Sequence, residues 1–204
     1  MYHKHHTKGL VLSGRTEGDS DKRINIFTES FGLLNAKVQG GRNLHSKLRG
    51  GIQDFSFGEF SLVSGKTGWR VVSVRAEKNF FEIFHQTPEK LKIAGNILSL
   101  IKKLAGEENN PTLFPIIFNF FNFLEKVNPI SDAGATKSLG QEQDIALAEC
   151  LTLMRILHSL GYMRHDPELL IPMSSAEISI EDLVTIAPKR AKIITLINES
   201  LKAT

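Results

Sequence analysis

The sequence predicts an α+β protein, with a small five-stranded β-barrel at the N-terminus followed by an all-helical region. Three observations lead to this fold class. Apolar and polar residues alternate with a period of two through roughly the first 75 residues, and the period then lengthens to about 3.6. The first part also holds most of the glycines. We therefore expect a barrel domain in residues 1–80 and a helical domain in residues 81–204.

Five short segments are predicted to form the strands of the barrel. Each is an apolar or alternating run between glycines or polar turn residues, and they are residues 7–13, 22–28, 33–39, 55–63 and 69–76. In the fifth segment, Val71, Ser73 and Arg75 are expected on one face and Val72 and Val74 on the other. Because no long helix interrupts them, five short strands favour a closed barrel, and the OB-fold is the leading candidate.

Helical spacing of apolar residues begins after the last of these strands. Pro88 is expected to open a helix that ends before Gly106, and Pro188 another that runs to about Leu201. Ser179 is expected to cap a short turn ending at Ile186. Two more helices are predicted over residues 112–127 and 141–160, with a loop at 128–140 and an irregular stretch at 164–175.

The charge of the chain is distributed unevenly between the two predicted domains. Residues 1–80 hold 13 Lys and Arg against 7 Asp and Glu, a net charge of +6, whereas residues 81–204 hold 12 against 15, a net charge of −3. Such asymmetry is typical of a module that binds a polyanion, joined to a region with a different partner.

A basic loop, residues 40–56 with the sequence GGRNLHSKLRGGIQDFS, joins the third and fourth predicted strands. Its glycines indicate a mobile backbone, and we expect the segment to bury no apolar face. Its leading candidates for contact with nucleic acid phosphates are Arg42, Lys47 and Arg49, with Lys37 on the preceding strand. An ordinary solvated loop is the alternative. Five further residues are candidates to extend the basic track: Arg15, Lys22, Arg23, Arg70 and Arg75.

The sequence offers little support for catalysis, a metal or a cofactor. The histidines at 3, 5 and 6 have no cysteine nearby, and the acidic turn of Glu17, Asp19 and Asp21 is expected to be solvated. No nucleotide-binding or nucleophile motif is present, and the single cysteine, Cys150, excludes a four-cysteine zinc site. We expect no enzyme activity and no cofactor. Aromatic residues such as Trp69 are either barrel core or stacking platforms for bases.

The segments 8–32 (KGLVLSGRTEGDSDKRINIFTESFG), 33–50 (LLNAKVQGGRNLHSKLRG) and 51–65 (GIQDFSFGEFSLVSG) resemble the RecO family of bacterial recombination mediators. A weaker likeness covers LMRILHSLGYMRHDPEL at 153–169. The resemblance implies an N-terminal OB-fold, binding of single- and double-stranded DNA, and annealing of complementary strands. It also implies two protein partners, the acidic tail of the single-strand binding protein and RecR, and a role in loading the RecA recombinase. Many members carry a four-cysteine zinc module, which this shorter chain lacks.

Two hypotheses follow. The first is a DNA-binding recombination and repair mediator without catalytic turnover, and the second is a protein-interaction scaffold that does not bind DNA. In the helical half, the basic residues available to an acidic tail are Lys102, Lys103, Lys189, Arg190 and Lys192. No apolar run reaches the roughly 20 residues that span a bilayer, and no signal peptide is evident, so a cytoplasmic, nucleoid-associated bacterial protein without membrane contact is expected.

Overall fold

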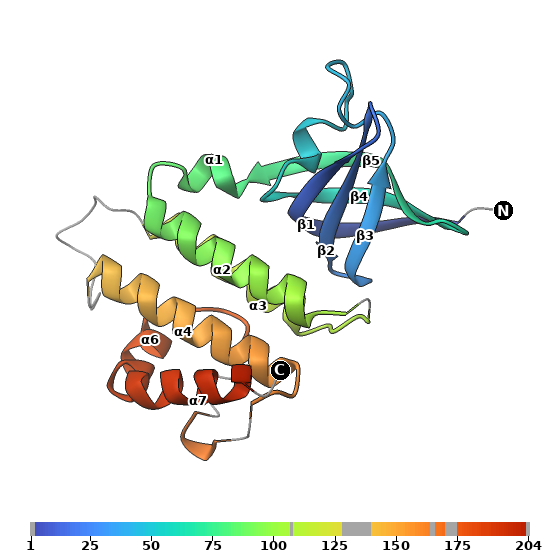
Figure 1. Ribbon diagram of the computed structural model, residues 1–204. Helices are drawn as coiled ribbons and strands as arrows, with labels where there is room; N and C mark the ends of the chain where they lie inside the picture. Colours follow the sequence, from blue (N-terminus) through green and yellow to red (C-terminus); the bar gives the residue numbers. More distant parts are fainter. Residues whose placement is uncertain (1–2, 107, 128–139, 164–165, 170–174, 203–204) are drawn as a thin grey trace. The chain divides into compact units, whose positions relative to one another are not determined.

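The computed structural model describes residues 3–106, 108–127, 140–163, 166–169 and 175–202 (Figure 1). The chain divides into two compact units. The first consists of Met1–Leu91 with Leu98–Pro111, and the second of Lys92–Ile97 with Thr112–Thr204. The domain boundary expected after residue 80 stays a prediction.

The first unit contains a closed five-stranded barrel in the order β1-β2-β3-β5-β4 (Figure 1). Its strands are β1 (Lys4–Glu17), β2 (Asp21–Thr28), β3 (Gly32–Val38), β4 (Ser56–Gly65) and β5 (Gly68–Asn79). All neighbouring strands are antiparallel except β3 and β5, whose short parallel pairing closes the barrel. The predicted α+β fold class is confirmed, with a barrel of OB type ahead of the helices.

The barrel core is built from the inward-facing residues that the alternating pattern predicts. Ile24 and Ile26 in β2, and Leu34, Ala36 and Val38 in β3, are all buried. The other buried members of this cluster are Val11, Ile52, Phe60, Leu62 and Val71. Alternation thus identifies the inner faces of β2 and β3, because side chains of a strand project to opposite faces in turn.

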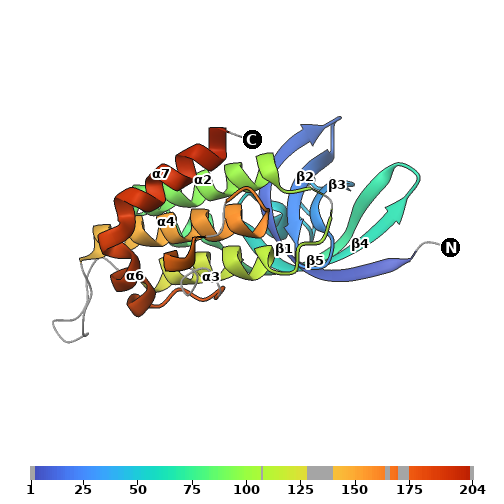
Figure 2. The ribbon, with the colours of Figure 1, turned by 90° about the horizontal axis from the view of Figure 1, so that it is seen from below.

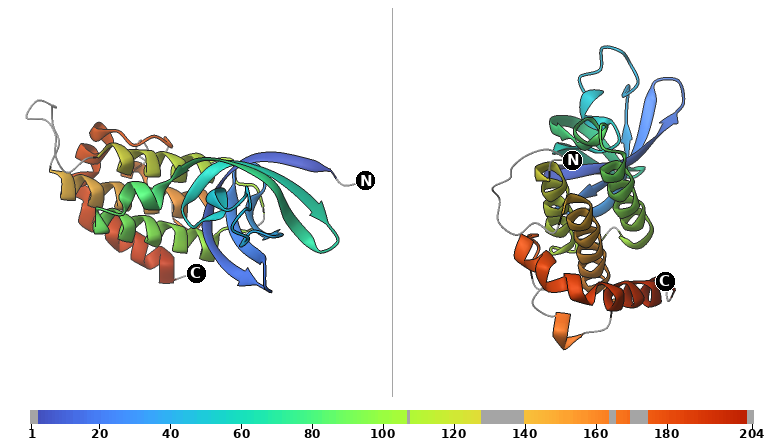
Figure 3. Two further views of the ribbon diagram at one scale, coloured as in Figure 1. Left: turned by 90° about the horizontal axis from the view of Figure 1, so that it is seen from above. Right: turned by 90° about the vertical axis from the view of Figure 1, so that its left-hand side faces the viewer.

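The predicted alternation in β5 is wrong at one point. Ser73 pairs with Ser61, but Val71 pairs with Leu62, so Val72 is an extra residue in a β-bulge. A bulge shifts the inward and outward pattern by one residue. Val71 and Val74 therefore both face the core cluster, whereas Val72 is 44% exposed. Strands β4 and β5 form the hairpin that contains this bulge, and the chain turns between Gly65 and Gly68 (Figure 3).

Two helices follow the barrel. Helix α1 (Phe80–Phe84) is capped by the side chain of Asn79, and α2 (Pro88–Leu104) begins at the predicted Pro88. The chain beyond α2 returns to the barrel, where the Leu33 N–H donates to the Gly106 carbonyl over 3.0 Å. Gly32 allows this approach, since it has φ +66° and a Cβ there would lie 2.6 Å from the Glu108 carbonyl oxygen. The end of α2 therefore belongs to the barrel unit.

The second unit is helical. Its helices are α3 (Leu113–Lys126), α4 (Gln141–Ser159), α6 (Ile180–Ile186) and α7 (Arg190–Lys202), and α4 contacts the other three (Figure 2). The last helix begins at Arg190, after a 3₁₀ turn over Ala187–Lys189, and not at Pro188 as predicted. The loop predicted at 128–140 and most of the irregular stretch at 164–175 lie outside the described residues.

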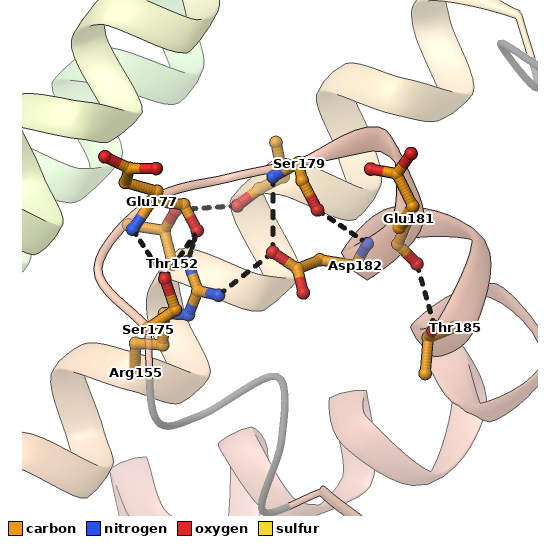
Figure 4. Close-up of polar contacts among 9 residues, drawn as sticks. Thr152, Arg155, Ser175, Glu177, Ser179, Glu181, Asp182 and Thr185 are labelled. Atoms are coloured by element: carbon orange, nitrogen blue, oxygen red, sulfur yellow. Dashed lines mark hydrogen bonds and ion pairs between the residues drawn. The ribbon is translucent and has the colours of Figure 1, made fainter. Parts of the chain in front are cut away.

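Arg155 of α4 joins this helix to the segment that leads into α6 (Figure 4). Its guanidinium donates from Nη1 to the Glu177 carbonyl over 2.8 Å and lies 3.4 Å, through Nη2, from Asp182 Oδ2. Asp182 also completes the predicted cap of α6, because it accepts from the Ser179 N–H while Ser179 Oγ accepts from the Asp182 N–H. Arg155 is only 1% exposed, and burial lowers its pKa although Asp182 opposes that effect.

Candidate nucleic-acid interface

Four of the predicted DNA-binding residues form one row across the outer face of the barrel. Strand register places Arg15 of β1 opposite Arg23 of β2, Arg23 opposite Lys37 of β3, and Lys37 opposite Arg70 of β5. Directly paired residues project from the same face of a sheet. Strand register cannot be read from the local pattern of the sequence, so this row, which we call the basic row, emerges only from the strand pairing.

Two members of the basic row are held by carboxylates at the adjoining ends of β1 and β2. Arg23 donates from Nε and Nη2 to the two oxygens of Glu17, over 2.7 and 2.9 Å. Lys37 Nζ lies 2.9 Å from Asp21 Oδ2. The hydrogen bonds from Arg23 lower the pKa of the Glu17 carboxyl group, and the Gly40 N–H together with Lys37 lowers the pKa of the Asp21 carboxyl group. Glu17 and Asp21 are therefore structural partners of the row, and the acidic turn is not merely solvated.

Arg15 and Arg70 are exposed, and neither is in an ion pair with any described residue. The same holds for Lys47 and Arg49 of the basic loop within the described parts of the chain. These four cations are therefore available to phosphates without first breaking an internal ion pair.

The basic loop is docked on the turn between β1 and β2 (Figure 1). The Arg42 N–H donates to the Ser20 carbonyl over 2.9 Å, and Arg42 Nη1 donates to the Gly18 and Asp19 carbonyls over 3.2 and 3.1 Å. Asp21 Oδ1 accepts from the Gly40 N–H over 2.9 Å. Arg42 thus stabilises the loop, although its exposed side chain still adds positive charge there.

Lys22 has a different place from the one predicted. Its Nζ donates to the Ile52 carbonyl over 2.7 Å and lies 3.9 Å from Asp54 Oδ1. Burial lowers the pKa of Lys22, and Asp54 partly opposes that effect. Lys22 therefore binds the C-terminal end of the basic loop to the barrel and positions the loop there.

The expectation that the basic loop buries no apolar face is wrong. Ile52, in a 3₁₀ turn over Gly50–Ile52, is fully buried in the barrel core, and Leu48 packs against the same cluster. Two glycines have packing roles instead of simple mobility. A Cβ at Gly41 would lie 2.9 Å from Ile52 Cδ1, and one at Gly51 would lie 2.6 Å from Val74 Cγ2. Close packing of the loop on the barrel therefore requires glycine at both positions.

Arg75 lies outside the basic row. Strand register places it beside Glu59 of β4, which is itself opposite Lys8 of β1, and Arg75 Nη2 lies 2.9 Å from Glu59 Oε2. This neighbourhood carries charges of both signs. Arg75 is therefore the least suitable of the nine predicted residues for contact with a phosphate, and it serves below as a control.

Trp69 lies half-buried in an aromatic cluster on the barrel. Its ring centroid is 5.2 Å from that of Phe31 and 5.4 Å from that of His5, and the His5 and Phe31 centroids are 5.2 Å apart. Trp69 and Phe31 also pack against the core cluster. The core interpretation of Trp69 accounts for these contacts. In the described residues no three His, Cys, Asp or Glu side chains gather as metal ligands.

The basic residues proposed for an acidic tail are divided between the two units. Lys102 and Lys103 belong to the barrel unit, and Lys189, Arg190 and Lys192 to the helical unit. Lys192 Nζ lies 2.8 Å from Asp166 Oδ2 and 3.0 Å from Glu168 Oε2. Sequence reasoning missed Lys102 as a neighbour of the barrel, because only the return of the chain at Gly106 brings it there.

The dependence of folding stability on pH below neutrality tests whether Asp21 docks the basic loop on the barrel. Its folded pKa lies below the ordinary value of 3.8, because the Gly40 N–H and Lys37 bind the carboxylate. The stabilisation is thus fully present above the ordinary pKa and disappears as the pH falls through the lowered folded pKa. We expect Asp21→Asn to reduce the thermal midpoint near pH 7, with the difference from wild type shrinking as the pH falls below 3.8 through the lowered folded pKa. A constant difference across this range would contradict the assignment.

The barrel matches the family model described as "Recombination protein O N terminal" over residues 1–77. The first unit is thus a barrel domain of a class found in recombination proteins. The chain is also similar to the DNA repair protein RecO of Alkaliphilus metalliredigens, with 29% identity over 59% of this chain and 49% of the relative. For the DNA repair protein RecO of Heliobacterium modesticaldum, the identity is 26% over 83% of this chain and 55% of the relative.

These matches show that residues 1–77 belong to the family of RecO N-terminal domains, and that the chain is similar over more of its length to DNA repair proteins called RecO. The relative from Desulfitobacterium hafniense is 25% identical over 78% of this chain and 52% of its own length. The chain thus spans about half the length of the curated relatives it matches. Among the helices of the described residues, none combines the length and apolar character needed to cross a bilayer.

Proposed function

We propose that the chain is a DNA-binding recombination and repair mediator that anneals complementary strands without catalytic turnover. The observation that carries this proposal is the basic row, which places Arg15, Arg23, Lys37 and Arg70 side by side over four strands. OB-type barrels bind nucleic acid strands along one face with help from flanking loops. The match of the barrel to the N-terminal domain of recombination protein O, and the similarity of the chain to DNA repair proteins called RecO, support the same activity.

The physical basis of annealing is neutralisation of charge. Two complementary strands repel each other through their phosphates, and Lys or Arg contacts release the condensed counterions of each strand. The free cations Arg15 and Arg70 lie at the two ends of the basic row, and Lys47 and Arg49 lie in the loop. A surface with this many free cations lowers the repulsion between strands held near it, so base pairing follows without bond making or breaking by the protein.

The proposed partners follow from the family and not from a site in this chain. We infer that the protein works with the acidic tail of the single-strand binding protein and with RecR, and helps load the recombinase on coated DNA. A cytoplasmic, nucleoid-associated location is consistent with that role. Lys189 and Lys192 already bind Asp166 and Glu168, so an acidic tail would have to compete with these internal contacts.

Removal of the four free cations tests the proposed function. We expect the variant with Arg15, Lys47, Arg49 and Arg70 all changed to alanine to bind single-stranded DNA with a logarithmic salt slope reduced by about 3. Strand annealing should slow accordingly. The measurement is fluorescence anisotropy over a range of salt concentrations, alongside an annealing assay. Arg75→Ala is the control, because Arg75 is paired with Glu59 outside the row. Equal slopes for wild type and the fourfold variant would contradict the proposal.

One observation favours the alternative of a scaffold that does not bind DNA. Five of the nine predicted residues donate to groups of the protein itself, and these are Lys22, Arg23, Lys37, Arg42 and Arg75. A scaffold predicts almost no salt-dependent binding to DNA, whereas a mediator predicts an affinity that falls steeply as salt rises. The titration of the wild-type protein therefore separates the two functions.

A further inference from the structure

A polar cavity of about 380 Å³ lies beside the basic row on the outer face of β1, β2 and β3. Every charged side chain that lines it is cationic, and the remaining side chains are hydroxyl or amide groups. The lining side chains are Ser13, Arg15, Arg23, Asn25, Asn35 and Lys102. All of them belong to the barrel unit.

The side chains of this cavity form a chain of hydrogen bonds in which each donates to the next, from Arg23 to Ser13. Arg23 Nη1 donates to Asn35 Oδ1 over 3.2 Å, and Asn35 Nδ2 donates to Asn25 Oδ1 over 2.8 Å. Asn25 Nδ2 then donates to Ser13 Oγ over 3.0 Å. Each amide oxygen uses one of its two lone pairs in this chain of hydrogen bonds, and the Ser13 O–H and the second N–H of each amide are available as donors to a ligand.

The charged side chains of the cavity are positive, so they favour the same kind of ligand as the hydrogen-bond donors, an anion. Glu17 binds Arg23 through Nε and Nη2, which leaves Nη1 for Asn35. Arg15 and Lys102 are exposed and have no ion-pair partner in the described parts of the chain. Two cations that have no ion-pair partner among the described residues, next to a set of oriented donors, favour an anion with several acceptor oxygens over a neutral base edge.

Lys102 reaches the cavity because the chain beyond α2 is fixed to the barrel. The Leu33 N–H bonds to the Gly106 carbonyl, and Gly32 admits the backbone of residue 108. Lys103, the next residue of α2, is also exposed but does not line the cavity. The helix therefore offers two neighbouring lysines, of which only one is placed at the site.

We propose that this cavity binds a phosphodiester group of a nucleic acid backbone, with Lys102 and Arg15 as its charged contacts and Ser13 as the terminal hydrogen-bond donor. The proposal rests on the proposed DNA-binding function and locates one contact of that function. It extends the basic row from the barrel to helix α2, so that a strand lying along Arg15, Arg23, Lys37 and Arg70 also touches a helix.

Two lysine variants of equal charge test the site. Lys102→Gln and Lys103→Gln each remove one exposed cation from α2, and binding of an oligothymidylate of about 20 nucleotides is followed at several salt concentrations. We expect Lys102→Gln to reduce the salt slope by about 0.7 and to weaken binding about fivefold at 0.1 M salt. Lys103→Gln should leave the slope unchanged. Ser13→Ala should weaken binding about twofold to tenfold without altering the slope.

The outcomes separate this proposal from the function on which it rests. If the wild-type protein shows no salt-dependent binding to the oligonucleotide, the proposed DNA-binding function itself is contradicted. Wild-type binding with equal slopes for the two lysine variants would overturn the cavity alone. The side-chain amide resonances of Asn25 and Asn35 should shift with the oligonucleotide and much less with inorganic phosphate at the same ionic strength. The reverse order would show that free phosphate, and not a phosphodiester, is the ligand.

Discussion

Arg155→Ala is expected to lower the free energy of unfolding of the helical unit by about 3 kcal/mol or more. The substitution removes a side chain that is 1% exposed, so it leaves a cavity between α4 and the segment that leads into α6. It also leaves the Glu177 carbonyl and the Asp182 carboxylate without their guanidinium partner. Because Asp182 caps α6, the loss reaches the start of that helix.

Denaturant unfolding followed by circular dichroism measures this effect, and Lys126→Ala is the control. Lys126 is exposed at the end of α3, and substitutions at such positions usually change stability by less than about 0.5 kcal/mol. DNA binding at a temperature where the variant is folded should be unchanged, since the basic row lies in the barrel unit. An Arg155→Ala protein as stable as the control would show that the buried network contributes little.

Much of the fold is predictable from local pattern. Period-two alternation identifies Ile24 and Ile26 as core, and Pro88 and Ser179 mark the first turns of α2 and α6. These features are encoded by residues close together in the sequence, where strand faces and helix caps are decided. The bulge at Val72 was not predictable in this way, because it depends on the partner strand β4.

The candidate site was predictable in composition but not in arrangement. The basic residues are visible in the sequence, yet only strand register separates Arg70, in the basic row, from Arg75, which pairs with Glu59. The docking role of Arg42 depends on the turn between β1 and β2, which lies more than one strand away in the sequence. Contacts between segments that are distant in the sequence therefore decide which cations are already in ion pairs or hydrogen bonds. Composition alone does not reveal these contacts.

Ile52 is the fully buried apolar anchor of the basic loop, and Ile52→Ala is the sharpest test of its contribution. Ile52 is 0% exposed in the barrel core, and its carbonyl accepts from Lys22 Nζ. Truncation of a buried isoleucine to alanine costs about 2 to 5 kcal/mol, and we expect a loss in that range. Because Ile52 follows directly on the cationic stretch of the loop, Lys47 and Arg49 should also become more mobile and bind DNA more weakly.

Leu44→Ala provides a matched control in the same loop. Leu44 is 77% exposed, so its truncation removes a similar apolar side chain without opening a cavity, and stability should change by less than about 0.5 kcal/mol. Trypsin cleavage after Lys47 and Arg49 reports the mobility of the loop directly. We expect faster cleavage in Ile52→Ala and no change in Leu44→Ala. Equal cleavage in both would mean that the hydrogen bonds of Asp21 and Arg42, and not the buried side chain, hold the loop on the barrel.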